Sequence, residues 1–297
     1  MKTTILYHQN CLDGFGAAMV ALLNFRSEGE VRLVPWQYQT PCPVLDEMVF
    51  ERVVVLDVSG DRDEMEALAH RSVEMWWLDH HAISASTTRA AVGGGAKVVL
   101  SSTDATCVLA WKTFFPESNW IPPVLRHVQD YDLWLFDLRG TREVCERLRL
   151  LGWVESAWLE LLSDEGDEVE RLENEGRLLV AARDNEVERI AKNVAVQARL
   201  RLAMVNSTVW PNEVAELVLD LHEEVDVVGV WYARRGLVKW SLRARKNTVP
   251  VNELAAIFGG GGHACAAGCV MECTPMAHDL RLSDALETLQ EKGGLTA

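Results

Sequence analysis

The sequence lacks the features of an exported or membrane-spanning protein. No apolar run approaches the roughly 20 residues needed to cross a bilayer. The opening stretch, Met1 to His8, is too short for a secretory signal and runs directly into polar residues. The seven cysteines are an odd number scattered along the chain, which is typical of free thiols and not of a disulfide framework. We therefore expect a cytoplasmic protein with no membrane partner.

Blocks of basic residues are also missing. The chain has 29 Lys and Arg against 44 Asp and Glu, a net charge of −15, and its densest basic stretch is Arg243-Ala244-Arg245-Lys246. Proteins that track a long nucleic acid contact many phosphates through Lys and Arg. We therefore expect no long nucleic-acid partner, and a short substrate if that substrate is a phosphate ester.

The pattern that is present is an alternation of strands and helices. The 297 residues suffice for one large or two medium domains. In the first hundred residues, helices are expected at 16–24 and 62–70, and apolar strands at 3–7, 31–34, 53–56, 73–78 and 97–100. Continuous apolar strands separated by helices indicate a doubly wound parallel sheet, which binds ligands at the carboxyl ends of its strands.

The second half of the chain predicts a separate, smaller domain. Residues 102–153 look mostly helical, and 168–193 predict a long connecting helix. Strands are expected at 200–205, 215–219, 225–232 and 237–242, with a hairpin turn at 233–236 and helices at 251–258 and 283–291. The predicted fold is α/β: a parallel-sheet catalytic domain over 1–185 and a smaller α/β substrate-binding domain over 200–297, with the active site in the interdomain cleft.

Acidic residues and histidines gather where strands are expected to end. They are His8 with Asp13, then Asp57, then Asp79-His80-His81, and Asp130-Tyr131-Asp132 after a helical segment. Carboxylates gathered at one edge repel one another unless cations neutralise them. Mixed carboxylate and imidazole ligands suit Mn²⁺, Fe²⁺ or Zn²⁺. On these residues alone, a metal site and a set of ordinary helix caps and turn residues both remain open.

A glycine run near the end of the chain predicts an anion cradle. Gly259 to Gly262 are followed by His263 and by small residues up to Gly268. A glycine backbone can bring its N–H groups close to an anion, and His263 can add a donor. Taken alone, such a run is more simply a flexible loop.

Together these motifs resemble the DHH phosphoesterase superfamily. The resemblance is to the subgroup with a DHH-associated C-terminal domain, which includes nanoRNases, pAp phosphatases and linear-dinucleotide hydrolases. It rests on the Asp79-His80-His81 triplet, the His8 to Gly14 opening, Asp57, the segment beginning at Asp130, and the terminal GGGGHACAAG stretch. These motifs follow one another in the family's order along nearly the whole chain.

The resemblance implies two Mn²⁺ ions, with Mg²⁺, Fe²⁺ or Co²⁺ as alternatives. Asp57 would bridge the ions, His8 would bind one of them, and the other would be bound by Asp13, His80 and Asp130. Asp79 would orient a ligand, and His81 would face the scissile phosphate. Asp132 is a further candidate site residue: it would either lie beside the metal ligands or cap a helix. Substrate binding would fall to Arg243, Gly260, Gly261, Gly262 and His263.

The first motif departs from the family pattern. Many relatives carry an additional Asp two or three positions before the one that aligns with Asp13, and here the three residues that precede Asp13 are Asn10, Cys11 and Leu12. Asn10 can offer a carbonyl oxygen, which is a weaker ligand than a carboxylate. We therefore expect the ion at His8 and Asp57 to bind loosely, or only together with substrate.

The function implied by the resemblance is hydrolysis of a phosphoric ester. The acidic charge and short length disfavour a processive exonuclease of the RecJ type, and the glycine-histidine motif disfavours the related inorganic pyrophosphatases. We favour cleavage of linear dinucleotides such as pGpG, the intermediate of cyclic-di-GMP turnover, or of other short oligoribonucleotides, to mononucleotides. The alternative enzyme is a pAp 3′-phosphatase, and the alternative of another class is a non-catalytic nucleotide-binding member. Base preference and oligomeric state stay open, a homodimer included.

Overall fold

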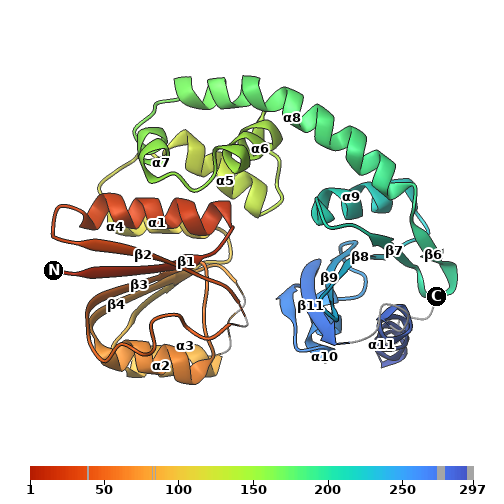
Figure 1. Ribbon diagram of the computed structural model, residues 1–297, viewed down its shortest axis with the longest axis horizontal. Helices are drawn as coiled ribbons and strands as arrows, with labels where there is room; N and C mark the ends of the chain where they lie inside the picture. The colour runs from red at the N-terminus through yellow and green to blue at the C-terminus, as the bar shows by residue number, and fades with distance from the viewer. Residues whose placement is uncertain (39, 82, 84, 273–277, 293–297) are drawn as a thin grey trace. The chain divides into compact units, whose positions relative to one another are not determined.

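The computed structural model describes residues 1–297 except 39, 82, 84, 273–277 and 293–297. The chain divides into two compact units, Met1–Val180 and Ala181–Ala297 (Figure 1). Each unit has its own sheet, with a hydrophobic core on each face of that sheet.

The first unit is built on a five-stranded parallel sheet with the strand order β2-β1-β3-β4-β5. Its strands are β1 (Thr3–His8), β2 (Val31–Trp36), β3 (Phe50–Leu56), β4 (Ser72–Asp79) and β5 (Lys97–Leu100). Helices α1 (Leu12–Phe25) and α4 (Thr106–Phe114) cover one face, and α2 (Arg62–Arg71) and α3 (Ala85–Gly93) cover the other (Figure 1). The predicted parallel α/β sheet is confirmed.

The coverage of both faces explains why these strands are continuous apolar runs. On β3, Val54 and Leu56 pack in the core beneath α1 and α4, whereas Val53 and Val55 pack in the core on the opposite face. Successive side chains of a strand point to opposite faces, so a strand between two helical layers needs apolar residues at every position.

Four further helices complete the first unit and lead into the second. Helices α5 (Pro123–Asp132), α6 (Thr141–Leu151) and α7 (Glu155–Leu162) pack against α1 and α4. The long α8 (Asp167–Ala191) contributes Val169 and Leu172 to the core of the first unit. Its last turns contribute Val187 and Ala191 to a core of the second unit.

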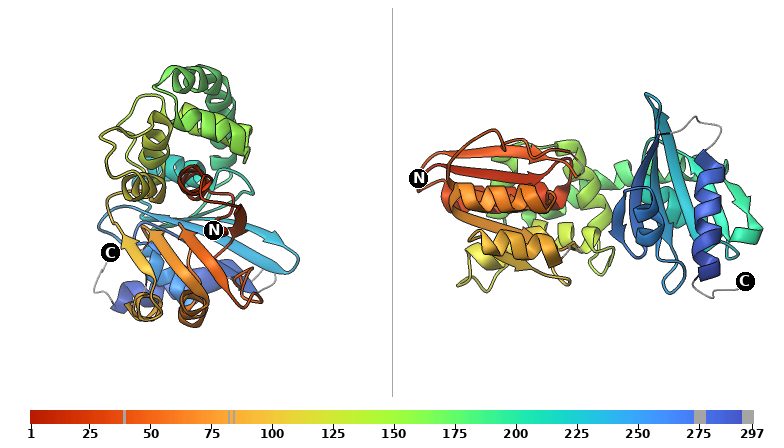
Figure 2. Two further views of the ribbon diagram at one scale, coloured as in Figure 1. Left: turned by 90° about the vertical axis from the view of Figure 1, so that its left-hand side faces the viewer. Right: turned by 90° about the horizontal axis from the view of Figure 1, so that it is seen from below.

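The second unit contains a six-stranded mixed sheet with the order β10-β11-β9-β8-β7-β6. Its strands are β6 (Ala195–Gln197), β7 (Leu202–Asn206), β8 (Val227–Arg234), β9 (Leu237–Ala244), β10 (Gly261–His263) and β11 (Ala266–Glu272), with a short 3₁₀ helix at Ala198–Leu200. Helix α9 (Pro211–Leu221) lies on one face, while α10 (Val251–Ile257) and α11 (His278–Lys292) lie on the other. The right-hand view of Figure 2 shows α11 along its face of the sheet.

One predicted strand of this unit is wrong. Residues 215–219 belong to α9, which begins at Pro211, a residue that favours the first turn of a helix. Val214, Ala215 and Val218 are its buried apolar residues, a helical spacing that the apolar run at 217–219 obscured. By contrast, the predicted turn between β8 and β9 is present, with left-handed backbone at Arg235 and Gly236.

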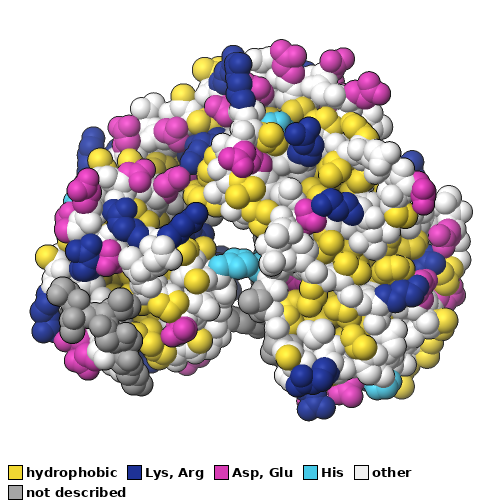
Figure 3. All heavy atoms as spheres, turned by 180° about the vertical axis from the view of Figure 1, so that it is seen from behind, with side chains coloured by type: hydrophobic (Ala, Val, Ile, Leu, Met, Phe, Trp, Pro, Cys, Tyr) yellow, Lys and Arg dark blue, Asp and Glu magenta, His cyan; other side chains and the backbone are white. Residues whose placement is uncertain are grey.

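The surface carries charges of both signs. On the face drawn in Figure 3, Lys and Arg side chains lie scattered among Asp and Glu. Within the described part of the chain, no helix has both the length and the hydropathy required to cross a membrane.

Candidate metal centre

Three neighbouring strands of the first unit end at the same level with a histidine or an aspartate. The parallel register pairs Tyr7 with Leu56, and Leu56 with Leu78. The residues that follow are His8 on β1, Asp57 after β3 and Asp79 on β4. Since β1 and β3 lead to helices on opposite faces, this edge is the switch point of the sheet, where such folds bind ligands.

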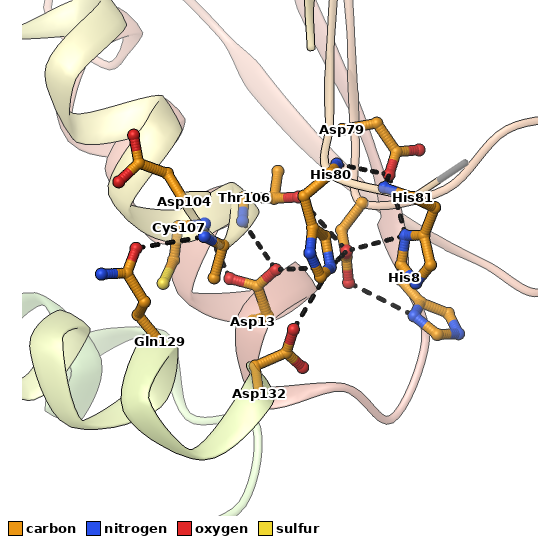
Figure 4. Close-up of polar contacts among 12 residues, drawn as sticks. His8, Asp13, Asp79, His80, His81, Asp104, Thr106, Cys107, Gln129 and Asp132 are labelled. Atoms are coloured by element: carbon orange, nitrogen blue, oxygen red, sulfur yellow. Dashed lines mark hydrogen bonds and ion pairs between the residues drawn. The ribbon is translucent and has the colours of Figure 1, made fainter. Parts of the chain in front are cut away.

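His80 lies at the middle of a group of carboxylates (Figure 4). Its Nε2 atom is 3.2 Å from Asp132 Oδ2, 3.4 Å from Asp57 Oδ1 and 3.7 Å from Asp13 Oδ2. Asp13, Asp57 and His80 are almost completely buried. Neighbouring ligands of an octahedral ion with bonds of about 2.1 Å are about 3 Å apart, so this donor set fits a divalent cation.

Asp13 is held in place by the N-terminus of α4. Its Oδ2 accepts a hydrogen bond from the N–H of Thr106 at 2.8 Å, and its Oδ1 accepts one from the N–H of Cys107 at 2.7 Å. The residue before this helix is Ala105, whose side chain provides no cap. Asp13 therefore caps α4 from another helix, and this fixes the oxygen that faces His80.

A second group of donors lies on the other side of Asp57. The Cys11 Sγ, a ring nitrogen of His8 and a carboxylate oxygen of Asp57 lie within 4.8 Å of one another. Gln37 Oε1 accepts a hydrogen bond from His8 Nε2 at 2.9 Å, which leaves His8 Nδ1 facing Asp57 Oδ2 at 3.3 Å. A proton or a bound cation is needed between these two atoms. The amide acts on His8 as the outer partner of a ligating histidine usually does.

Asp79 organises the His80-His81 turn. Its Oδ1 accepts hydrogen bonds from the backbone N–H of His80 and His81 and from His81 Nδ1, at 2.8, 3.0 and 2.8 Å. The Tyr38 hydroxyl donates to the backbone oxygen of Asp57 and lies 3.2 Å from His81 Nδ1. The imidazole of His81 is therefore oriented by two groups and remains about a quarter exposed, at 27%.

The electrostatics of the cluster favour a bound cation. Burial and the charges of Asp57 and Asp132 raise the pKa of Asp13 well above its usual value. Burial opposes ionisation of Asp57 too, but hydrogen bonds from His8 and His80 outweigh it and lower the pKa of Asp57. Burial lowers the pKa of His80, yet Asp57, Asp132 and Asp13 raise it to about 10. The site thus stabilises positive charge at its centre.

Cys11 and His81 respond to the same carboxylates. Burial and the charges of Asp57, Asp132 and Asp13 raise the pKa of the Cys11 thiol. Burial lowers the pKa of His81, but its hydrogen bond to Asp79 and the charge of Asp57 raise it overall. Without a cation, the thiol therefore stays protonated and the imidazolium form of His81 is favoured.

The structure does not bring the carboxylate of Asp130 to His80. Its carboxylate accepts hydrogen bonds from the backbone N–H groups of Asp137 and Leu138 and from the hydroxyl of Thr141. These contacts hold the loop after α5. Asp132 at the end of α5 is the residue that reaches His80. Residues two apart on a helix do not share a face, so only one of the pair can point to the centre.

Asn10, which was expected to offer a side-chain oxygen to the ion near His8, lies at the surface. It is exposed and has a left-handed backbone, with φ of 58°. The next residue, Cys11, is the one whose side chain approaches His8 and Asp57. Gly14 explains how α1 can begin so close to β1, because a Cβ atom there would be 2.7 Å from the His8 carbonyl oxygen.

The predicted substrate-binding residues lie together within the second unit. Arg243 on β9 and His263 on β10 are both in register with Ala266 on β11, so the three form one row on one face of the sheet. The guanidinium of Arg243 donates to Asn212 of α9 and to the Leu242 carbonyl.

The last two glycines of the run, Gly261 and Gly262, belong to the edge strand β10, and the backbone passes close to β11 along the run. A Cβ atom at Gly260 would lie 2.1 Å from the Gly268 oxygen, and one at Gly262 would lie 2.5 Å from the Ala266 oxygen. Gly261 has no such neighbour within 4 Å. Two of the three glycines are thus required for pairing with β11.

Besides Cys11, three residues of the centre were missed by the sequence reasoning. Gln37 and Tyr38 directly follow β2, so the rule that located Asp57 could have found them. Thr106, whose hydroxyl donates to Asp57 Oδ1 at 3.2 Å, belongs to a helix start without a sequence signal.

Comparison with known sequences finds a distant relative but no matching family model. No protein-family model matches the sequence. "Uncharacterized protein R106" of Acanthamoeba polyphaga mimivirus is 24% identical over 285 residues, which are 89% of this chain and 66% of the relative. The chain thus spans just under two thirds of that relative's length.

Solved structures resemble the chain over nearly all of its length. An exopolyphosphatase-related protein from Bacteroides fragilis has a TM-score of 0.60 at 15% identity, covering 98% of this chain and 93% of that one. RecJ in complex with Mn²⁺ from Thermus thermophilus has a TM-score of 0.58 at 15% identity, covering 97% and 52%. The pGpG-specific phosphodiesterase PggH from Vibrio cholerae has a TM-score of 0.50 at 12% identity, covering 98% and 99%. The chain shares the fold of these proteins, and this is the fold that the resemblance to the DHH phosphoesterases implied.

Proposed function

We propose that this protein is a metal-dependent phosphodiesterase that hydrolyses very short nucleotide substrates, above all linear dinucleotides such as pGpG, to mononucleotides. The observation that carries the proposal is the convergence of Asp13, Asp57 and Asp132 on His80 at the carboxyl edge of the parallel sheet. Proteins with this fold include a RecJ that binds Mn²⁺ and a pGpG-specific phosphodiesterase, which supports both the cofactor and the reaction.

The side chains present fit a pair of divalent ions. Asp13, His80 and Asp132 would hold one ion and His8 would hold the other. Asp57, which lies near both His8 and His80, would contribute to both. Such ions activate water for attack on phosphorus and neutralise charge on the phosphoryl oxygens. We expect Mn²⁺, with the other divalent ions named above as alternatives.

His81 would act on the reacting phosphate as a proton carrier. Its Nδ1 donates to Asp79. Burial lowers the pKa of His81, but this hydrogen bond and the charge of Asp57 raise it overall, which favours the protonated ring. Nε2 would then donate to a phosphoryl oxygen or to the leaving oxygen, where negative charge develops. Asp79 and Tyr38 fix the plane of the ring, so they are positioning residues for this step.

The second unit would bind the part of the substrate that does not react. Arg243 can grip two phosphate oxygens with its planar fork, and His263 lies in the same row of the sheet. A net charge of −15 suits a substrate with few phosphates better than a long chain. These features favour a dinucleotide over a polymer.

The test is a comparison of substrates with the purified protein and Mn²⁺. A length series of 5′-labelled RNAs is incubated beside pAp, with EDTA and Asp57→Ala as controls. We expect fastest turnover of the dinucleotide, and a loss of at least about 100-fold with either control, because both ions share Asp57. Phosphate release from pAp with idle dinucleotides would make the protein a pAp 3′-phosphatase. Binding without turnover would make it a non-catalytic nucleotide-binding protein.

A further inference from the structure

We propose that the thiolate of Cys11 is the third protein ligand of the ion held by His8 and Asp57, and that this site therefore prefers Zn²⁺, Co²⁺ or Fe²⁺ to Mn²⁺. The inference rests on the proposed metal centre and concerns the first motif, where this chain departs from the family pattern. It replaces Asn10 as the residue that fills the place of the missing carboxylate.

The geometry that supports the proposal is the triangle of Cys11, His8 and Asp57. One ligand atom from each lies within 4.8 Å of the other two, and all three come from the ends of β1 and β3 or the residue before α1. The Gln37 amide fixes the ring of His8 so that Nδ1 points toward Asp57 Oδ2. A cation between these atoms would also be within reach of the sulfur.

The position of Cys11 in the helix start shows that its side chain serves no capping role. Cys11 is the N-cap residue of α1, with extended backbone at φ −115° and ψ 131°, and its carbonyl accepts the first helical hydrogen bond from Phe15. Its thiol makes no capping hydrogen bond, although Ser, Thr, Asp or Asn would normally do so here. Cys11 thus occupies the N-cap position without capping the helix, and its thiol lies near His8 and Asp57 instead.

Asn10 cannot substitute for Cys11 without a change of backbone. It is exposed, and its left-handed conformation sets it apart from the extended Cys11 that follows. Cys11 and Asp13 are separated only by Leu12, and both reach the centre, Asp13 at the His80 side and Cys11 at the His8 side. Each ion would therefore receive one ligand from this short segment.

The chemistry of sulfur sets the metal preference. Coordination replaces the thiol proton by the ion, the proton passes to solvent, and no electron is transferred. Thiolates select softer ions such as Zn²⁺, whereas carboxylate, carbonyl and water ligands suit Mn²⁺ and Mg²⁺. The two sites would differ: the His80 site, with three carboxylates available, suits Mn²⁺, and the Cys11 site suits a softer ion.

The experiment is a Co²⁺ titration of the metal-free protein, followed by absorption spectroscopy. We expect a thiolate-to-cobalt charge-transfer band in the near ultraviolet that saturates with one of the two bound ions. Cys11→Ser should abolish this band and retain the visible bands of bound Co²⁺. Serine is a preferred N-cap, so this variant should fold. Cys265→Ser is the matched control, since Cys265 is also partly exposed but lies in the second unit, and it should keep the band.

A second variant measures the preference itself. With Zn²⁺ and Mn²⁺ in competition, Cys11→Asp should shift the retained ions toward Mn²⁺ by at least about tenfold, because it restores a carboxylate. Visible cobalt bands without the charge-transfer band, or a band that survives Cys11→Ser, would overturn the role of Cys11 and leave the metal centre intact. Failure of the unaltered protein to bind Co²⁺, Mn²⁺ or Zn²⁺ would overturn the metal centre together with this inference.

Discussion

Protonation of His80 is expected to determine how metal binding depends on pH. Burial lowers its pKa, but the facing carboxylates of Asp57, Asp132 and Asp13 raise it to about 10. In the metal-free protein the ring is therefore protonated at neutral pH, while a ligating imidazole must be neutral. Each ion that binds at His80 must displace this proton, so metal affinity should fall as the pH falls.

Proton release can be measured by titration calorimetry of Mn²⁺ binding in two buffers with different ionisation enthalpies. At neutral pH we expect release of at least about one proton per ion at this site. Burial and the charge of Asp57 raise the pKa of Asp132 to about 6, so below that pH Asp132 must also lose a proton and the dependence should steepen. Identical binding enthalpies in the two buffers would contradict this account.

The end of α5 places two aspartates in different surroundings. Asp130 accepts three hydrogen bonds from the segment 137–141, whereas Asp132 lies 3.2 Å from His80. We expect Asp130→Asn to cost about 1–3 kcal/mol in the free energy of unfolding, with metal affinity nearly unchanged. Asp132→Asn should do the reverse, lowering Mn²⁺ affinity at least about tenfold with little loss of stability.

Chemical unfolding and Mn²⁺ titration of the two variants, side by side, check this pair of expectations. Both substitutions remove one charge two residues apart, so each is the control for the other. If Asp130→Asn weakened metal binding more than Asp132→Asn, Asp130 would be restored as the ligand.

The edge strand β10 depends on glycine at one position and not at its neighbour. A Cβ atom at Gly262 would lie 2.5 Å from the Ala266 oxygen, and the backbone there has φ of 139°. Gly261 meets nothing within 4 Å. We expect Gly262→Ala to separate β10 from β11 and Gly261→Ala to preserve the pairing. Amide hydrogen exchange at 266–268 should accelerate in the first variant alone, and equal exchange in both would refute the steric argument.

At the scale of the whole molecule, our proposal assigns the chemistry to the first unit and substrate binding to the second. Binding energy far from the reacting phosphate is used to position it, so losing that grip should reduce turnover as well as affinity. We expect Arg243→Ala and His263→Ala each to lower kcat/KM for a dinucleotide at least about 100-fold, roughly 3 kcal/mol. On bis-p-nitrophenyl phosphate, which is too small to need the second unit, the loss should stay below about tenfold.

Steady-state kinetics on both substrates measure this division directly. Equal losses on the dinucleotide and on the small phosphodiester would place Arg243 and His263 at the reacting phosphate, and the division would have to be abandoned. Asp57→Ala is the reference variant, because its loss should be equally large on both substrates.

The parallel sheet and the strand-end positions of His8, Asp57 and Asp79 followed from the sequence alone. Strands covered on both faces must be apolar throughout, which makes them visible as short continuous runs. Parallel strands bring their carboxyl ends to one edge, so residues far apart in the chain could be expected there together. The family resemblance then added the roles of these residues and of the glycine-histidine stretch.

Tertiary structure decided which of several neighbouring candidates reach the centre. Asp132 and not Asp130 faces His80, since their side chains leave α5 in different directions and the following loop takes up Asp130. Cys11 and not Asn10 approaches His8, since Asn10 itself has a left-handed backbone and Cys11 an extended one. Periodicity and motif spacing locate an element and its end to within a few residues. The direction of one side chain depends on a single backbone angle and on the partners packed around it, and only the folded chain supplies these.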